Sequence, residues 1–261
     1  MSDSSKVNLS LFNINVLCGR YVELNSDWNA TNVCSPFSRI YMITEGEGCL
    51  RYGETELIFK PGNIYVIPAG LRISFSTETS LSKSFFHISI PTPTGYDLLE
   101  QLDRCIVFND SASICKITEE LKSHSFQNTF SIKAYIYHLV YKFLVEMGDI
   151  RIQRSSELIT RTVEYINKNL YASLTVENIA EAVFVSSAKL RKTFRDEMEI
   201  PIGQYISDRI IIQAEEMIRT SNISIKEVSD SLGFCDQFYF SRCFTKKFGL
   251  SPSEYRKNIN T

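Results

Sequence analysis

The sequence predicts an α+β protein of two domains, a β-sandwich or small β-barrel with following helices and then an all-helical domain. Three observations favour this fold class. Residues up to about 90 alternate between polar and apolar, apolar residues from 95 to 147 recur three and four apart, and the chain from residue 157 onward has helical periodicity throughout. At 261 residues the chain is long enough for two separate hydrophobic cores.

The N-terminal strands are predicted from two segments, "RIYMITEGEGCLRY" and "TELIFKPGNIYVIPAGLRISF". Both alternate Ile, Tyr, Phe and Val with polar residues, and glycines and prolines interrupt them at short intervals. Short strands with such closely spaced turns are typical of a sandwich or small barrel.

Helices are predicted after Pro93, in "GYDLLEQLDRC", "ASICKITEELKSH" and "FSIKAYIYHLVYKFLVEM". The polar, aperiodic segment "GDIRIQRSS" then indicates a linker. The predicted domains are therefore residues 1–147 and 157–261, with the linker at 148–156.

The helical domain contains an internal repeat. The segment "LTVENIAEAVFVSSAKLRKTFRDEMEIPIGQYI" matches "ISIKEVSDSLGFCDQFYFSRCFTKKFGLSPSEYR" about fifty residues later. In each copy a short amphipathic helix, a tight turn and a second helix follow one another, which is the pattern of a helix-turn-helix unit. We place the two units at about 174–199 and 223–249. Ser186 and Asp236 are predicted to cap the second helices, and Gly233 to supply a positive φ at the second turn.

The second helix of each unit separates apolar from basic residues. Leu190, Phe194 and Met198 correspond to Phe240, Phe244 and Phe248 and form the predicted buried faces. The opposite faces carry side chains that read base edges or hold phosphates, since Arg and Gln pair with guanine and adenine, Ser and Lys with phosphate oxygens, and apolar groups with the thymine methyl. The predicted DNA-contacting residues are Ser187, Ala188, Arg191, Lys192 and Arg195 in the first unit, and Gln237, Phe238, Ser241, Arg242 and Lys246 in the second.

The charge distribution supports this interpretation although the net charge is −2. Residues 186–195 and 237–247 are basic and contain no acid, although residues 155–261 as a whole carry equal numbers of basic and acidic residues. The alternative for either copy alone is a solvated face of a core helix, but two copies at a fixed spacing favour DNA. The connecting segment 202–221 would be a helix about 30 Å long, close to the ~34 Å between successive major-groove segments on one side of B-DNA.

The C-terminal hundred residues resemble the DNA-binding domain of the AraC/XylS family of transcription regulators. The resemblance rests on Gly233-Phe234, Asp236, Tyr239-Phe240, Phe244, Phe248-Gly249, Ser251-Pro252 and Tyr255-Arg256, and on "AEEMIR" in the connecting helix. It implies sequence-specific binding to double-stranded promoter DNA in a bacterium, on the nucleoid, usually as an activator that contacts RNA polymerase. Glu199 and Phe184 depart from the family pattern, and the geometry of the first unit's turns is open at these two positions.

The segment "FSRIYMITEGEGCLRYGETELIFKPGNIYVIPAG" resembles the cupin-type barrel that precedes this domain in many such regulators. The resemblance implies a small-molecule effector, a sugar or sugar derivative, and a homodimer formed through the N-terminal domain. In that family the helices after the barrel form the dimer contact, so residues 130–147 have two possible uses, packing on their own barrel and dimerisation.

Candidate effector residues follow from strand alternation. Arg39, Tyr41, Ile43 and Glu45 share one predicted strand face, and Arg39, Tyr41 and Glu45 could orient a hydroxylated ligand if that face points inward. His87 is the fourth candidate. The alternative assigns Arg39 and Glu45 to a surface ion pair and His87 to the hydrophobic core.

Several classes of function are disfavoured. Three histidines, His87, His124 and His138, do not make the His and carboxylate set of a metal-dependent cupin, so we expect no metal, no cofactor and no enzyme. Seven scattered cysteines form no zinc or disulfide pattern. We expect a cytoplasmic protein because no segment resembles a signal peptide or a membrane span. An effector-independent regulator and, less favoured, a cupin sugar-modifying enzyme with a helical appendage remain as alternatives.

Overall fold

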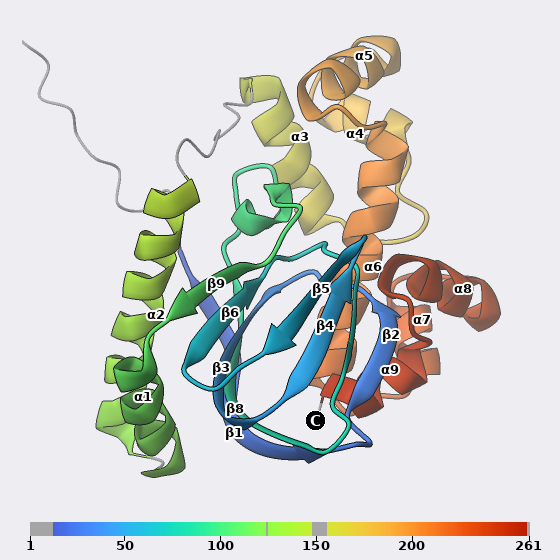
Figure 1. The fold of residues 1–261 in the computed structure, drawn as a ribbon. Helices are drawn as coiled ribbons and strands as arrows, with labels where there is room; N and C mark the ends of the chain where they lie inside the picture. The colour runs from blue at the N-terminus through green and yellow to red at the C-terminus, as the bar shows by residue number, and fades with distance from the viewer. Residues whose placement is uncertain (1–12, 124, 148–155, 260–261) are drawn as a thin grey trace, which may run out of the picture. The chain divides into compact units, whose positions relative to one another are not determined.

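The chain divides into two compact units, unit 1 with residues 1–152 and unit 2 with residues 153–261. The computed structural model describes residues 13–123, 125–147 and 156–259 (Figure 1). The division falls inside the predicted linker 148–156, of which only Ser156 belongs to the described residues.

The described part of unit 1 contains two antiparallel sheets. Their strands are β1 (Asn15–Asn25), β2 (Asn29–Val33), β3 (Ser38–Gly46), β4 (Gly48–Tyr52), β5 (Thr55–Phe59), β6 (Asn63–Ile67), β7 (Ile73–Ser76), β8 (Ser80–Ser89) and β9 (Ile106–Asn109). Sheet A has the order β1-β8-β3-β6-β9, and sheet B has the order β2-β7-β4-β5. The α+β class predicted from the sequence, with antiparallel strands first and helices after them, is confirmed.

One face of sheet A packs against two helices, α1 (Ser111–Ser123) and α2 (Phe126–Met147), which lie beside each other in Figure 1. Alternate residues of the strands, among them Ile40, Met42 and Phe86, are buried with Ile117 of α1 and Phe143 of α2. The intervening residues of the strands therefore lie on the other face of sheet A.

The other face of sheet A meets sheet B. Phe59 of β5 packs edge-on against Tyr65 of β6 with ring centres 4.8 Å apart and against Tyr41 of β3 at 5.9 Å. The Tyr65 hydroxyl donates to the Ile58 carbonyl at 2.8 Å. Aromatic side chains thus fill much of the space between the two sheets.

The helix predicted for "GYDLLEQLDRC" is wrong. Only a 3₁₀ turn (Leu98–Gln101) forms there, and β9 follows it and pairs with β6. Asp97 explains the short turn, because its carboxylate accepts the backbone N–H groups of Ile90 and Leu99 at 2.7 and 2.9 Å and so holds the chain against the end of β8. The periodicity of the segment did not reveal this buried cap.

Unit 2 is helical throughout its regular elements, as predicted. Its helices are α3 (Glu157–Lys168), α4 (Val176–Ala182), α5 (Ser187–Met198), α6 (Ile202–Thr220), α7 (Ile225–Ser231), α8 (Gln237–Phe248) and α9 (Pro252–Ile259). The pairs α4-α5 and α7-α8 are the two helix-turn-helix units, and α6 joins them (Figure 1). Helix α6 packs on both helix-turn-helix units, since its Tyr205 lies against Phe194 of α5 and it also contacts α7 and α8. Its Glu215 accepts a hydrogen bond from Tyr255 of α9.

Candidate functional site

Hydrogen bonds fix the start of each helix in the two units. Thr175 and Asn178 form a capping box on α4, and Ser224 and Glu227 form the equivalent box on α7. Ser186 accepts the Lys189 N–H at the start of α5, which confirms its predicted role as a cap. The repeat seen in the sequence is therefore also a repeat of local structure.

Asp236 caps α8 as predicted. Its carboxylate accepts the N–H groups of Phe238 and Tyr239 at 2.8 and 3.1 Å. The first turns of α5 and α8 contain no acidic residue, but the Asp236 carboxylate itself offsets the positive end of the α8 dipole. The start of α5, which the neutral Ser186 caps, favours an approaching anion electrostatically.

The predicted buried faces are confirmed. Leu190 and Phe194 of α5 are fully buried, while Met198 is partly buried. On α8, the rings of Phe240, Phe244 and Phe248 pack in series and against Tyr255 of α9. Since each helix places its apolar side inward, its opposite side is directed to solvent.

The exposed face of α5 carries four of its five predicted DNA-contacting residues. Ala188, Arg191, Lys192 and Arg195 are exposed, and Ser187 is partly exposed. Arg191 donates to Glu177 of α4 at 2.9 Å, an exposed ion pair of modest strength. Lys192 and Arg195 form no ion pair with any carboxylate in the described part of unit 2.

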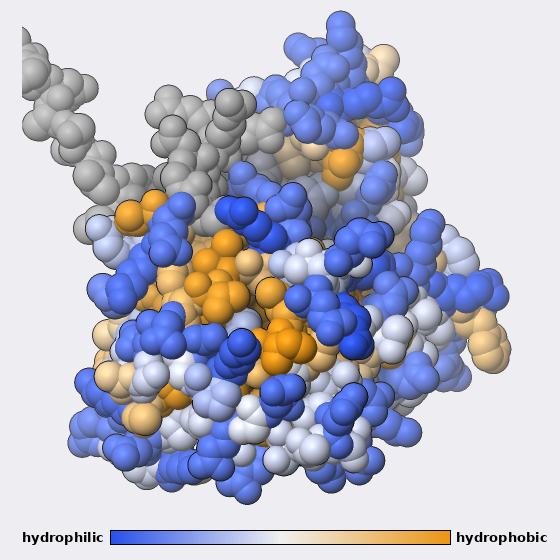
Figure 2. All heavy atoms as spheres, viewed as in Figure 1, coloured by the Kyte–Doolittle hydropathy of each residue, from blue (hydrophilic) through white to orange (hydrophobic). Residues whose placement is uncertain are grey.

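The exposed face of α8 carries the second predicted set. Gln237, Phe238, Arg242 and Lys246 are exposed and Ser241 is partly exposed. Phe238 is 76% exposed although it is large and apolar. The Arg242 guanidinium lies 6.0 Å from the centre of the Tyr239 ring, which holds it near the start of the helix. The visible surfaces of α5 and α8 are mostly hydrophilic (Figure 2).

The turns of the two units have the same backbone geometry with different residues. Phe184 has φ 60° where the second unit has Gly233 at 75°, and Glu199 ends α5 at 58° where Gly249 ends α8 at 83°. The departures seen in the sequence therefore leave the turn geometry unchanged, at the cost of left-handed conformations for two residues with side chains.

Two exposed aromatic residues were not predicted as contacts. Phe184 is 89% exposed in the turn of the first unit, and Tyr239 is 54% exposed on α8. Each lies next to a residue that the apolar pattern predicts to be buried, so the sequence alone did not predict their exposure. The turn of the first helix-turn-helix unit and the cap of α8 reveal it.

In unit 1 the structure brings together three of the four predicted effector residues. Arg39, Tyr41 and His87 are buried on the inner face of sheet A, where Arg39 pairs across strands with His87 and Tyr41 with Phe85. Burial raises the pKa of the Tyr41 hydroxyl, although the Arg39 charge opposes this. The inward orientation that the alternation left open is thus the one observed.

Glu45 does not join them. The register between β3 and β8 shifts between Ile43 and Glu45, and Glu45 is exposed near the end of the strand. The prediction that Glu45 shares a face with Arg39 is wrong because this bulge ends the alternation. The alternative of a surface ion pair between Arg39 and Glu45 is also wrong, since Arg39 is buried.

His87 has a packed environment. Its ring stacks on Phe37 with centres 4.5 Å apart, and its Nδ1 lies 3.3 Å from the Cys18 Sγ. His124 lies outside the described residues. Among the residues described, no group of three or more His, Cys, Asp or Glu side chains is arranged to hold a metal ion.

Lys83 and Trp28 belong to the same interior and were missed in the sequence. Lys83 is 2% exposed, and its Nζ lies 3.6 Å from the centre of the Tyr41 ring and 3.9 Å from that of Trp28. Burial, with the Arg39 charge, holds the pKa of the Lys83 ammonium well below its usual range. Strand alternation could have predicted this burial, because Lys83, Phe85 and His87 occupy alternate positions and therefore lie on the same face of the strand.

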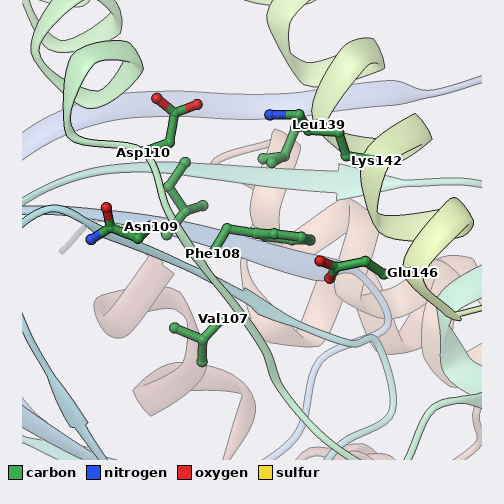
Figure 3. Close-up of a pocket in the computed structure, with 8 residues that line it drawn as sticks. Val107, Phe108, Asn109, Asp110, Leu139, Lys142 and Glu146 are labelled. Carbon is green, nitrogen blue, oxygen red and sulfur yellow. The ribbon is translucent and has the colours of Figure 1, made fainter.

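A pocket of about 260 Å³ lies elsewhere in unit 1, between β9 and α2 (Figure 3). Asp110, Lys142 and Glu146 supply its charged side chains, and none of the predicted effector residues lines it. Its volume is below that of ordinary small-molecule sites, which begin near 300 Å³.

No described helix is both long and apolar enough to cross a membrane.

Comparison with known proteins gives three kinds of match. The model of a helix-turn-helix domain family matches residues 179–258. The lactose operon transcription activator of Staphylococcus xylosus is 25% identical over 85% of this chain and 85% of its own length. The raffinose operon transcriptional regulatory protein RafR of Pediococcus pentosaceus is 22% identical over 84% of each chain.

Among solved structures, ToxT from Vibrio cholerae has a similar fold. The match has a TM-score of 0.61 at 14% identity and covers 95% of this chain and 97% of that one. Because the similarity spans both units, the succession of a β-rich unit and a helical unit is shared.

Proposed function

Because the chain belongs to the AraC-type transcription regulators through its helix-turn-helix domain, we propose that it binds promoter DNA in a sequence-specific manner and activates transcription in response to a sugar or sugar derivative. The observation that carries the DNA-binding part is the duplicated helix pair. Each copy has a buried apolar face, a capped start to its second helix and an exposed basic face.

The spacing of the two units suits one DNA duplex. Helix α6 has 19 residues and is therefore about 28 Å long. Successive major-groove segments on one side of B-DNA lie ~34 Å apart, so α5 and α8 would enter adjacent segments. The two faces would then read one continuous operator from a single chain.

The contacts divide into two roles. Arg195, Gln237 and Arg242 carry forked or amide groups that can pair with base edges, while Lys192 and Lys246 supply point charges for phosphates. Phe238 offers an apolar surface for thymine methyl groups. Arg191 would contact DNA either after its ion pair with Glu177 has opened or while that pair stays formed.

The effector part of the proposal is supported by the relatives and by the interior of unit 1. The named relatives regulate lactose and raffinose operons. Arg39, Tyr41 and His87 form a buried polar row beside aromatic rings, a combination that binds hydroxyl groups and the apolar faces of sugar rings.

Dimerisation through unit 1 is supported by α2. Its exposed aromatic and aliphatic residues, Phe126, Phe130, Tyr137, Tyr141 and Val145, recur at intervals of four and seven. Such a stripe on a helix matches the seam of a helix pair. Other residues of α2 pack on sheet A, so the exposed face is available for the proposed dimer contact while the buried face packs on its own sheet.

The proposal assigns no catalytic reaction to the chain. It places the protein in the bacterial cytoplasm, where promoter DNA is reached, and makes RNA polymerase the partner of the activator. A cupin enzyme would have no use for two basic helix faces at a fixed spacing.

The proposed function is tested by selecting operators from random duplexes with the full chain and measuring affinity by gel shift. Arg242→Ala should weaken operator binding by about 1–3 kcal/mol and relax specificity at one position. Lys192→Ala should weaken operator and scrambled DNA alike. Lys168→Ala, an exposed lysine on α3, is the matched control and should leave binding unchanged. Unchanged binding in both test variants would exclude these faces as the DNA interface.

A further inference from the structure

The inner face of sheet A holds two buried cations. Lys83 is 2% exposed and Arg39 is 8% exposed. Arg39 donates to the Ser35 hydroxyl and lies over the Phe37 ring, and the Lys83 ammonium lies over Tyr41 and Trp28. Within the described residues, neither cation forms an ion pair with a carboxylate.

In their charged forms, the Lys83 ammonium and the Arg39 guanidinium would oppose each other and lose their hydration. Buried charges in proteins are normally paired, because an uncompensated ion is costly in a medium of low polarity. Burial lowers the pKa of Lys83, and the Arg39 charge adds to this effect. Aromatic rings replace only part of the lost hydration. The pair is therefore unfavourable for the fold alone, and a function would account for it.

The strand register brings the two side chains toward one place. On the inner face of sheet A, the cross-strand pairs between β3 and β8 follow in the order Arg39 with His87, Tyr41 with Phe85 and Ile43 with Lys83. One pair separates the two cations, and the Lys83 side chain extends over the ring of Tyr41 in that intervening pair. An anionic group above Tyr41 would lie within reach of both.

We propose that the effector is an anionic sugar derivative whose carboxylate or phosphate binds Lys83 and Arg39 on the inner face of sheet A. This inference rests on the effector part of the proposed function. The anion supplies the charge that the interior lacks, through hydrogen bonds from a guanidinium and an ammonium. The aromatic rings beside the cations pack against the apolar face of the sugar, and His87 and Tyr41 bind its hydroxyl groups.

Trp28 is the element that admits the ligand. It belongs to the short connection between β1 and β2, and its ring stacks on Phe75 with centres 4.4 Å apart while it covers Lys83. Because Trp28 lies outside the strands, its ring can move away from Lys83 without breaking a strand pairing. It makes way for the anion and then packs on the sugar.

Trp28 also provides the assay, since it is the only tryptophan of the chain. Its emission, in the full-length protein without DNA, reports directly on a change at Lys83. The probes are two series that differ only at carbon 6, galactose with galacturonate and galactose 6-phosphate, and glucose with glucuronate and glucose 6-phosphate. Inorganic phosphate is the bare anion, and ionic strength is held constant with chloride.

The expected result is an anionic member that binds at least about tenfold more tightly than its neutral parent, a difference worth about 1.4 kcal/mol. Comparing the carboxylate with the phosphate identifies which anion the site takes. Lys83→Met should remove the preference and raise the melting temperature of the free protein, because it removes an unpaired buried charge. Arg39→Gln should also reduce the preference.

The matched control is Lys122→Met. The Lys122 ammonium also lies over a ring, 3.8 Å from the centre of Tyr21, but the residue is exposed. This variant should keep the preference for the anion. Retention of the preference in both Lys83→Met and Arg39→Gln would overturn the proposal.

Two further results would also overturn it, equal affinity for neutral and anionic sugars, or no response of Trp28 to any anion in the panel. Gel shifts separate this failure from that of the proposed function. A protein that binds operator DNA but fails the titration remains a DNA-binding regulator without an anionic effector. Loss of specific DNA binding would refute the proposed function whatever the titration shows.

Discussion

The residue with left-handed backbone conformation in the turn of the first helix-turn-helix unit allows the sign and the size of a change in stability to be predicted. Phe184 has φ 60°, whereas the equivalent residue of the second unit is Gly233 at 75°. Replacing Phe184 with glycine removes the conflict between Cβ and the backbone. Phe184 is 89% exposed, so the variant loses little burial, and its N–H bond to the Glu181 carbonyl does not need the side chain.

The magnitude follows from two opposing effects. A residue with a side chain costs about 1–2 kcal/mol in the left-handed region, while glycine loses about 0.5–1 kcal/mol more conformational freedom on folding. Phe184→Gly should therefore stabilise unit 2 by about 0.5–1 kcal/mol, which raises its melting temperature by about 2–8 °C. The reciprocal variant Gly233→Ala should lower it. A Cβ at Gly233 would meet its nearest atom at 3.6 Å, so the loss comes from φ rather than from a clash.

The two units can be followed separately in thermal unfolding of the full chain. Trp28 fluorescence follows unit 1, since the chain has no other tryptophan. Far-ultraviolet circular dichroism follows the helices of both units, and the part of its transition that does not coincide with the Trp28 transition reports on unit 2. Both variants should leave the Trp28 transition unchanged. A lower melting temperature for Phe184→Gly, or no loss for Gly233→Ala, would refute the assignment of strain to this turn.

Three further predictions concern a cap, a buried acid and a helix face. Asp236→Ala should destabilise unit 2 by about 0.5–2 kcal/mol and weaken operator binding in gel shifts, whereas Asp236→Asn, which can still cap, should restore most of both. Burial raises the pKa of Glu215 to about 7, so folding favours the protonated carboxyl. This preference stabilises the folded state by up to about 3 kcal/mol. The stabilisation is fully present below the ordinary pKa of 4.5 and is lost as pH rises through about 7. In denaturant unfolding, the free energy of unfolding should fall between about pH 4.5 and pH 7 in the wild type and not in Glu215→Gln. The same fall in the variant would contradict the assignment to Glu215. Tyr141→Glu should convert the dimer to a monomer in light scattering at an unchanged Trp28 transition, and Lys133→Glu, an exposed residue of the same helix, serves as the comparison.

The DNA-binding unit was predictable because its signals are local and repeated. Apolar residues four apart, a capping residue and a turn glycine specify each helix pair, and the second copy removes the ambiguity of the first. Burial of Phe194 and Phe244 and the caps at Ser186 and Asp236 follow from these patterns. The exposure of Phe184 does not, because a phenylalanine at a left-handed position contradicts the usual preference for glycine.

The interior of unit 1 was predicted only in part because it depends on pairing between distant strands. Alternation placed Arg39 and Tyr41 correctly on one face, but the bulge before Glu45 arises from the pairing of β3 with β8. The burial of Lys83 likewise depends on Trp28, which lies far from it in the chain. A lysine in a strand is ordinarily assigned to solvent, so its parity with His87 was overlooked.

The central claim is that two faces of one chain read two segments of one duplex, and a hydroxyl-radical footprint on the selected operator tests it most directly. The wild type should protect two windows about one helical turn, ~10 base pairs, apart. A variant with Lys192→Ala and Arg195→Ala should lose protection in one window only, and Arg242→Ala should weaken the other. A single window in the wild type, or equal loss of both windows in each variant, would contradict the bipartite reading of DNA.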